Sequence, residues 1–174
     1  IIMENWTNLY KELTEILQDK MPEILWIDLW HNQVNFLQDE HPFRTPAVFL
    51  SFRTLGTQDL GMLQQEINLQ VDFYLFYETF ADTYNGAFNQ ESALEFLHSM
   101  DELHTTFHGL SGKNFSAMRR IGFAPEDTGG AGNLYRISFS CIMQDTGAMK
   151  EMEERVVTAQ LVNDMGDNEF VIIP

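Results

Sequence analysis

The sequence predicts an α+β fold, in which an antiparallel β-sheet carries two main helices on one face within a single domain. The first observation is a long stretch, residues 67–78, in which apolar and polar side chains alternate as they do on a half-buried strand. One parity carries Ile67, Leu69, Val71, Phe73, Leu75 and Tyr77. The second observation is a three- and four-residue apolar spacing in residues 5–21 and 89–108, which is typical of amphipathic helices. Helices and strands that alternate in blocks favour α+β architecture.

The first half of the chain begins with the helix over residues 5–21, for which Asn5 is a candidate cap and Pro22 a stop. A short strand follows over residues 24–30. Trp26 and Trp30 share one of its faces opposite a second apolar face, so both faces are expected to meet other groups.

The next segments lead to the long strand. We expect residues 31–45 to form an extended loop or partial strand, and residues 47–53 to form a strand that Pro46 opens. Residues 54–65, which contain two glycines, are predicted to be the loop that joins this strand to the long one. The long strand itself is expected to be central in the sheet. Asn68, Gln70 and Asp72 are expected to face water, whereas Tyr74 and Phe76 are expected to meet protein.

The second half begins with the helix over residues 89–108, for which Ser92 with Glu95 forms a candidate capping box and Asn89 is a competing cap. Two strands, residues 115–123 and 134–144, then flank a glycine-rich hairpin loop. We predict one domain over residues 3–147 and an acidic C-terminal arm over residues 148–174.

The amino-acid composition argues against several classes of protein. The 174 residues include 26 acids and 10 bases, for a formal charge of −16, which argues against a nucleic-acid-binding face. The single cysteine, Cys141, rules out an internal disulfide framework. We expect neither a membrane span nor a secretory leader, because no run of 18 apolar residues and no basic-then-apolar leader occurs.

Three features suggest chemistry, and each has a simpler interpretation. The glycines at 129–132 lack the lysine and hydroxyl residue of a phosphate loop, which favours a plain hairpin. His104 and His108 have helical metal-ligand spacing but no evident third ligand. Cys141 lies on an apolar strand face, where cysteine is usually inert. We therefore predict no catalytic residue, no metal site and no cofactor, and we do not expect an enzyme.

Arg119 and Arg120 are adjacent in a predicted strand and must point to opposite faces. At least one of them is expected to meet a carboxylate, either in an ordinary surface ion pair or at an interface.

The element order, the stretch Pro42-Phe43-Arg44-Thr45-Pro46-Ala47-Val48-Phe49-Leu50, and the pairing of residues 116–120 with 135–139 resemble phage tail terminator (tail-completion) proteins and their relatives in contractile tail-like particles. The likeness covers roughly residues 3–146. It implies a structural protein that forms a homo-oligomeric ring, typically a hexamer, on the last layer of the tail tube.

The same resemblance implies contacts with the tail tube protein and with a neck or head-completion protein. It also implies a place in the virion tail, or in a tail-like particle, assembled in the bacterial cytoplasm. No cofactor, membrane or sequence-specific nucleic acid is implied. Two other classes stay open: an acidic binding or regulatory module with a small-molecule or host-protein partner, and a small hydrolase.

Candidate interface residues are Trp26, Trp30, Arg119, Arg120 and the apolar segment Phe170, Val171, Ile172 and Ile173. Because an exposed apolar segment on an acidic chain favours association, we expect these last four residues to be covered. The hypothesis is that the arm adds an edge strand to a neighbouring subunit or ring.

Overall fold

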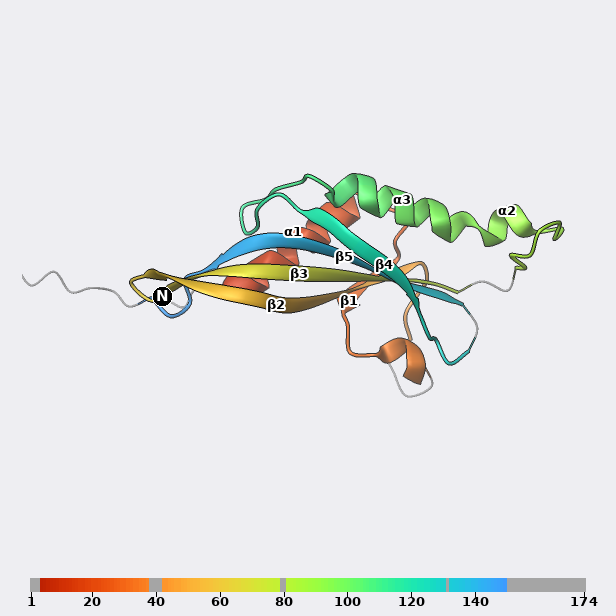
Figure 1. The fold of residues 1–174 in the computed structure, drawn as a ribbon. Helices are drawn as coiled ribbons and strands as arrows, with labels where there is room; N and C mark the ends of the chain where they lie inside the picture. The colour runs from red at the N-terminus through yellow and green to blue at the C-terminus, as the bar shows by residue number, and fades with distance from the viewer. Residues whose placement is uncertain (1–3, 38–41, 79–80, 131, 150–174) are drawn as a thin grey trace, which may run out of the picture.

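The computed structural model describes residues 4–37, 42–78, 81–130 and 132–149 (Figure 1). Its elements in chain order are α1 (Asn5–Lys20), β1 (Trp26–Leu29), the short 3-10 helix η1 (Gln33–Phe36), β2 (Ala47–Gly61), β3 (Gln64–Tyr77), α2 (Gln90–Ala93), α3 (Glu95–Phe107), β4 (Arg119–Glu126) and β5 (Asn133–Asp145). The strands form one sheet in the order β1-β2-β3-β5-β4, with β3 in the middle. The α+β fold and the central position of the long strand are confirmed.

The sheet is mixed. All neighbouring strands are antiparallel except β1 and β2, which run parallel with Trp26 opposite Ala47. A parallel pair requires a connection that returns the chain to the starting end of the sheet. Here the connection contains η1, a short 3-10 helix that was not expected within residues 31–45; the other described residues of this segment form no helix or strand.

The prediction of a loop over residues 54–65 is wrong. Instead, β2 continues to Gly61 and β3 begins at Gln64, so that only Met62 and Leu63 form the turn. The two glycines of this segment lie beside register shifts in the ladder, between Thr54 and Gly56 and between Asp59 and Gly61. Glycine here accommodates bulges within a strand and does not mark a loop.

None of the predicted caps forms a side-chain capping bond, although Asn89 does stand at the N-cap position of α2. Asn89 uses its side-chain oxygen to accept the Asp82 N–H at 3.2 Å, and the Ser92–Glu95 box does not form because Leu94 interrupts the helix between α2 and α3. Asn5 lies inside α1, where its amide donates to Asp145 Oδ1 at 2.9 Å. That bond ties the beginning of α1 to the end of β5.

Strand β4 begins four residues later than predicted. Phe115 and Met118 are almost fully buried, with 4% and 1% of their surfaces exposed, because this segment turns into the core before it joins the sheet. The strand then continues to Glu126, beyond the predicted end.

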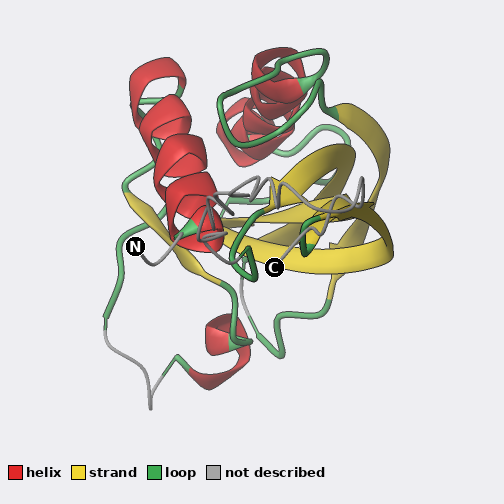
Figure 2. Cartoon of the chain, turned by 90° about the vertical axis from the view of Figure 1, so that its left-hand side faces the viewer, coloured by secondary structure: helices red, strands yellow, loops and turns green. Residues whose placement is uncertain are grey.

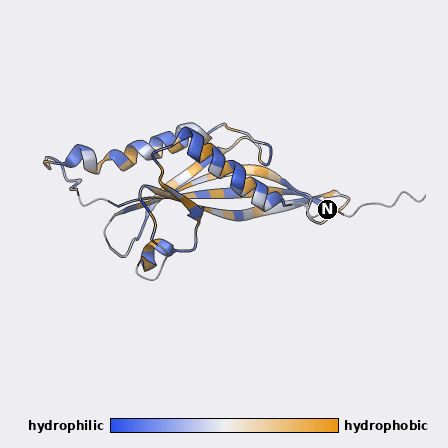
Figure 3. Ribbon diagram, turned by 180° about the vertical axis from the view of Figure 1, so that it is seen from behind, coloured by the Kyte–Doolittle hydropathy of each residue, from blue (hydrophilic) through white to orange (hydrophobic). Residues whose placement is uncertain are grey.

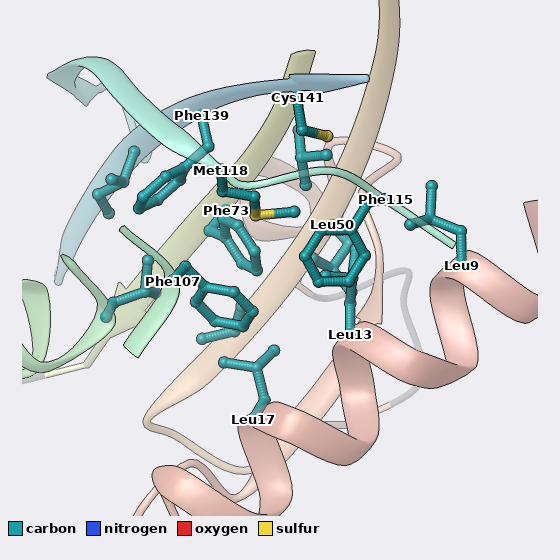
Figure 4. Close-up of a cluster of buried hydrophobic side chains, with 14 of the residues drawn as sticks. Leu9, Leu13, Leu17, Leu50, Phe73, Phe107, Phe115, Met118, Phe139 and Cys141 are labelled. Atoms are coloured by element: carbon teal, nitrogen blue, oxygen red, sulfur yellow. The ribbon is translucent and has the colours of Figure 1, made fainter. Parts of the chain in front are cut away.

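The main core lies between the helices and one face of the sheet (Figure 4). Leu9, Leu13 and Leu17 of α1 point toward Leu50 and Phe73 of the sheet (Figure 4). From α3, Phe107 packs on Phe73 with ring centroids 4.6 Å apart. Both helices therefore cover the same face, as predicted, and Figure 2 shows them on one side of the sheet.

A second, smaller core lies on the opposite face beneath η1 (Figure 2). Trp30 stacks on Tyr74 with centroids 4.0 Å apart, and Phe43 packs edge-on against Phe49 and Phe76. The expectation that Tyr74 and Phe76 meet protein is confirmed. Asp72, expected to face water, is only 5% exposed.

Candidate assembly surfaces

The turn between β2 and β3 places large apolar side chains in an unfavourable backbone conformation. Met62 and Leu63 both have positive φ, 51° and 64°, and they are 60% and 55% exposed. Two-residue hairpin turns with positive φ at both positions favour Asn-Gly, since a side chain in the left-handed region costs about 1–2 kcal/mol per residue. The hairpin tip thus combines backbone strain with apolar exposure, a combination that is typical of contact sites.

Two further leucines are exposed along the same strand. Leu55 and Leu60 are each 46% exposed, and each lies within one of the two register shifts of β2. A bulge inserts a residue that the partner strand does not match, and so redirects its side chain. Figure 1 shows this end of the hairpin extending past the helices.

Among the described residues, the outer edge of β2 has no partner strand over residues 51–61, a stretch that we call the free half of β2. Strand β1 accompanies β2 only from Ala47 to Leu50, and the Trp30 N–H makes the last bond between them, to the Leu50 carbonyl at 2.8 Å. From position 53 onward every residue of β2 is exposed. Unpaired backbone groups along such an edge can receive another strand.

Strand β4 forms the opposite edge of the sheet, where β5 is its one strand partner among the described residues and the Arg120 N–H donates to His108 Nδ1. Its exposed apolar side chains are Ile121 at 50% and Phe123 at 55%. The Arg120 guanidinium lies 5.7 Å from the Phe123 ring centroid, and Arg119 is exposed. A shallow hollow of about 260 Å³ lies beside these residues, lined by Gln70, Ile121, Gly122, Phe123, Ala124, Arg136 and Ser138.

The expected arginine ion pair is not found in the described part of the chain for either Arg119 or Arg120. The ion pair of this edge belongs to Arg136, whose Nε lies 3.2 Å from Glu126 Oε1. The guanidinium of Arg120 is occupied instead by the aromatic ring, which leaves Arg119 as the arginine of this edge that points to solvent.

The sheet face away from the helices carries a small polar network on β3 and β5. Asp72 accepts the Ser138 hydroxyl at 2.5 Å and the Gln70 amide at 2.9 Å. Burial raises the pKa of the neighbouring Tyr74, and a hydrogen bond from Arg136 opposes that shift. Since these donors satisfy the buried carboxylate, the network stabilises the sheet.

The residues considered for chemistry are held in unreactive settings. Cys141 is 5% exposed, and burial raises the pKa of its thiol to about 11, so little thiolate exists at neutral pH. The rings of His104 and His108 meet edge to face, with centroids 4.9 Å apart. Burial is the main cause that lowers the pKa of His104, and the positive charge of Arg120 is the second. No group of three His, Cys, Asp or Glu side chains suited to a metal ion occurs among the described residues.

No protein-family model matches this chain, and no curated protein matches it significantly in sequence. Within the described part of the chain, none of the helices is long and apolar enough to cross a membrane.

The predicted interface residues fall in separate places. Trp26 and Trp30 are half-buried and contribute to the second core, where the ring centroids of Trp26 and Phe43 lie 6.4 Å apart. Arg119 and Arg120 lie on the β4 edge. Residues Phe170, Val171, Ile172 and Ile173 lie outside the described residues, as does the arm from residue 150 onward.

The sequence does not identify the exposed residues of the hairpin, because the two glycines of their segment predict a loop. One signal could have found them: a strand as long as residues 67–78 needs a partner along its whole length, and the preceding residues are the nearest candidates.

Proposed function

We propose that this protein is a structural subunit of the phage tail terminator type, which assembles into a ring on the last layer of a tail tube or a related tail-like particle. The resemblance over residues 3–146 supports this proposal through the element order and the stretch from Pro42 to Leu50. The ring is typically six-fold in that family. The proposed partners are further copies of this chain, a tail tube protein, and a neck or head-completion protein.

The observation that carries the proposal is the hairpin tip. Four exposed apolar side chains, those of Leu55, Leu60, Met62 and Leu63, gather at one end of an otherwise acidic chain. Two of them are held at positive φ. An isolated subunit gains nothing from this arrangement, because the strain costs stability and the apolar surface meets water. Docking of the tip on the tube layer would remove these apolar side chains from water, and that gain would offset the backbone strain.

The geometry of the two edges also suits a ring. The free half of β2 and strand β4 lie at different positions in the sheet and carry different side chains. Contacts between unlike patches repeat head to tail, and they close into a ring when the rotation permits.

The proposal is tested by adding the purified chain to a polymerising tail tube protein from the same source. We expect an assembled species whose mass is an integer multiple of 20.2 kDa, and tubes that stop elongating when it is added. A protein that stays monomeric and leaves tube length unchanged would contradict the proposal. Such a monomer, if it bound a small molecule or a host protein, would support the binding-module alternative.

A further inference from the structure

Among the described residues, the two open edges of the sheet carry charges in the same order along the chain, arginine first and an acid later. Along β2, Arg53 comes first and Asp59 follows toward the tip. Along β4, Arg120 comes near the start and Glu126 stands at the end. When the two strands run antiparallel, Arg53 faces Glu126 while Asp59 faces Arg120. A parallel arrangement would bring arginine against arginine and acid against acid, so charge order favours the antiparallel one.

The faces of the two strands agree with this register. Arg53 pairs with Gln70 and Glu126 with Leu134, and both positions lie on the sheet face away from the helices. Asp59 pairs with Gln65 and Arg120 with Phe139, and both lie on the helix-covered face. Each charged pair would therefore meet on a single face, as neighbours in one sheet must.

The β-bulges keep the proposed β2–β4 pairing in register from the Arg53–Glu126 pair to the Asp59–Arg120 pair. One register shift separates the two charged residues on each strand, between Thr54 and Gly56 in β2 and between Arg120 and Gly122 in β4. The numbers of paired positions between the charges are therefore equal. In this register Thr57 of β2 stands opposite Phe123 of β4.

The backbone groups are also complementary. Pro125 has no N–H, and the Arg120 N–H already donates to His108 Nδ1 at 3.1 Å, so β4 offers chiefly carbonyl acceptors. Two β4 edges would consequently lack donors for each other. The free halves of β2 from two subunits could also pair antiparallel with their helix-covered faces on the same side. Arg53 would then stand opposite the uncharged Gln58, so no pair of opposite charges would form.

We infer that the free half of β2 in one subunit pairs antiparallel with β4 of a second copy of this chain, so that the sheet continues from subunit to subunit. This inference rests on the proposed function, since it names the contact that repeats around the ring. Leu60, Met62 and Leu63 lie beyond the paired residues and remain available to a neighbouring layer, whereas Leu55 falls within the paired stretch.

Disulfide trapping tests the register directly. In the full chain carrying Thr57→Cys and Phe123→Cys, mild oxidation should link the assembled subunits into a covalent ladder on a non-reducing gel. Either single variant should give no ladder, because the native Cys141 is buried. An assembled double variant that forms no ladder would overturn the inference. Covalent dimers from a Thr54→Cys/Thr57→Cys variant would overturn it too, since they would show β2 paired with another β2.

Charge exchange tests the complementarity independently. Asp59→Arg and Arg120→Asp should each weaken assembly by about tenfold, and their combination should restore most of the loss. Glu15→Arg, on the exposed side of α1, changes the net charge as Asp59→Arg does and should leave assembly unchanged. Circular dichroism would confirm that each variant is folded.

The two proposals fail differently. A wild-type chain that is monomeric at all concentrations would contradict both of them. A wild-type chain that assembles, but whose combined variant is no better than the single ones, would contradict the strand pairing and leave the ring intact.

Discussion

The β2–β3 hairpin has two halves in contrasting surroundings, although one antiparallel ladder runs through both. In the inner half Phe49, Leu50 and Phe73 are completely buried. In the outer half Leu60 is 46% and Met62 60% exposed. Figure 3 shows apolar residues along the sheet extending from beneath the helices to this end. The backbone hydrogen bonds between β2 and β3 therefore continue past the point where the side chains of β2 cease to be buried.

The cover ends for an identifiable reason. Helices α1 and α3 pack on one face of the inner half, and η1 packs on the other. Trp6, near the start of α1, lies 6.0 Å from Phe52 between ring centroids. Beyond Phe52 every residue of β2 is exposed, although Ile67 and Leu69 of β3 still belong to the main core. The leucines of the outer half lie at bulges and its turn carries strain, so the outer half is built for a contact that this chain alone does not supply.

The largest expected effect distinguishes folding from contact. Phe73→Asp places an unpaired charge in the main core, which should cost several kcal/mol and leave the protein unfolded or insoluble. Thr57→Asp makes the same kind of change in the outer half and should change the free energy of unfolding by less than about 0.5 kcal/mol. Urea unfolding of both variants checks this pair. A folded Phe73→Asp protein with wild-type stability would contradict the assignment of the core.

A medium effect is expected at the turn. Replacing Met62 with Asn and Leu63 with Gly supplies residues that suit positive φ, and should stabilise the monomer by about 1–2 kcal/mol. The same change removes two apolar contacts, so capping of tube protein should weaken. Thermal melting and tube length would be measured together. Increased stability with undiminished capping would show that the tip contacts nothing.

The smallest effect concerns Cys141 and pH. Its folded-state pKa is raised from 9.0 to about 11, so the folded state holds the thiol proton more tightly than the unfolded state. This contribution to stability is complete below pH 9 and is lost as the pH rises toward 11. A Cys141→Ala variant should therefore lose less stability than wild type between pH 8 and about pH 10.5 in urea titrations. Parallel losses in the two proteins would contradict a buried, protonated thiol.

Sequence patterns revealed the inner half and failed on the outer half for a physical reason. Alternation arises because one face of a strand is buried, and residues 67–77 show it clearly since the helices cover them. Residues 53–61 are exposed throughout, so no burial imposes a period on them. Their strand structure depends on pairing with β3, which a local pattern does not record.

The candidate surfaces divide in the same way. Arg119 and Arg120 could be identified from sequence because adjacent charges in a strand must face opposite directions. Leu55 and Met62 could not, because their significance comes from bulges and backbone angles that only the structure shows. Helix caps failed because Asn5 and Asn89 use their side chains for tertiary bonds.

The most direct test of the contrast between the two halves is amide hydrogen exchange of the full chain at low and high concentration. Assembly should slow exchange in residues 53–61 and in β4 and leave the inner half of the hairpin unchanged. Equal exchange at both concentrations in residues 53–61 would show that the free half of β2 meets no partner, which would contradict the proposed contact.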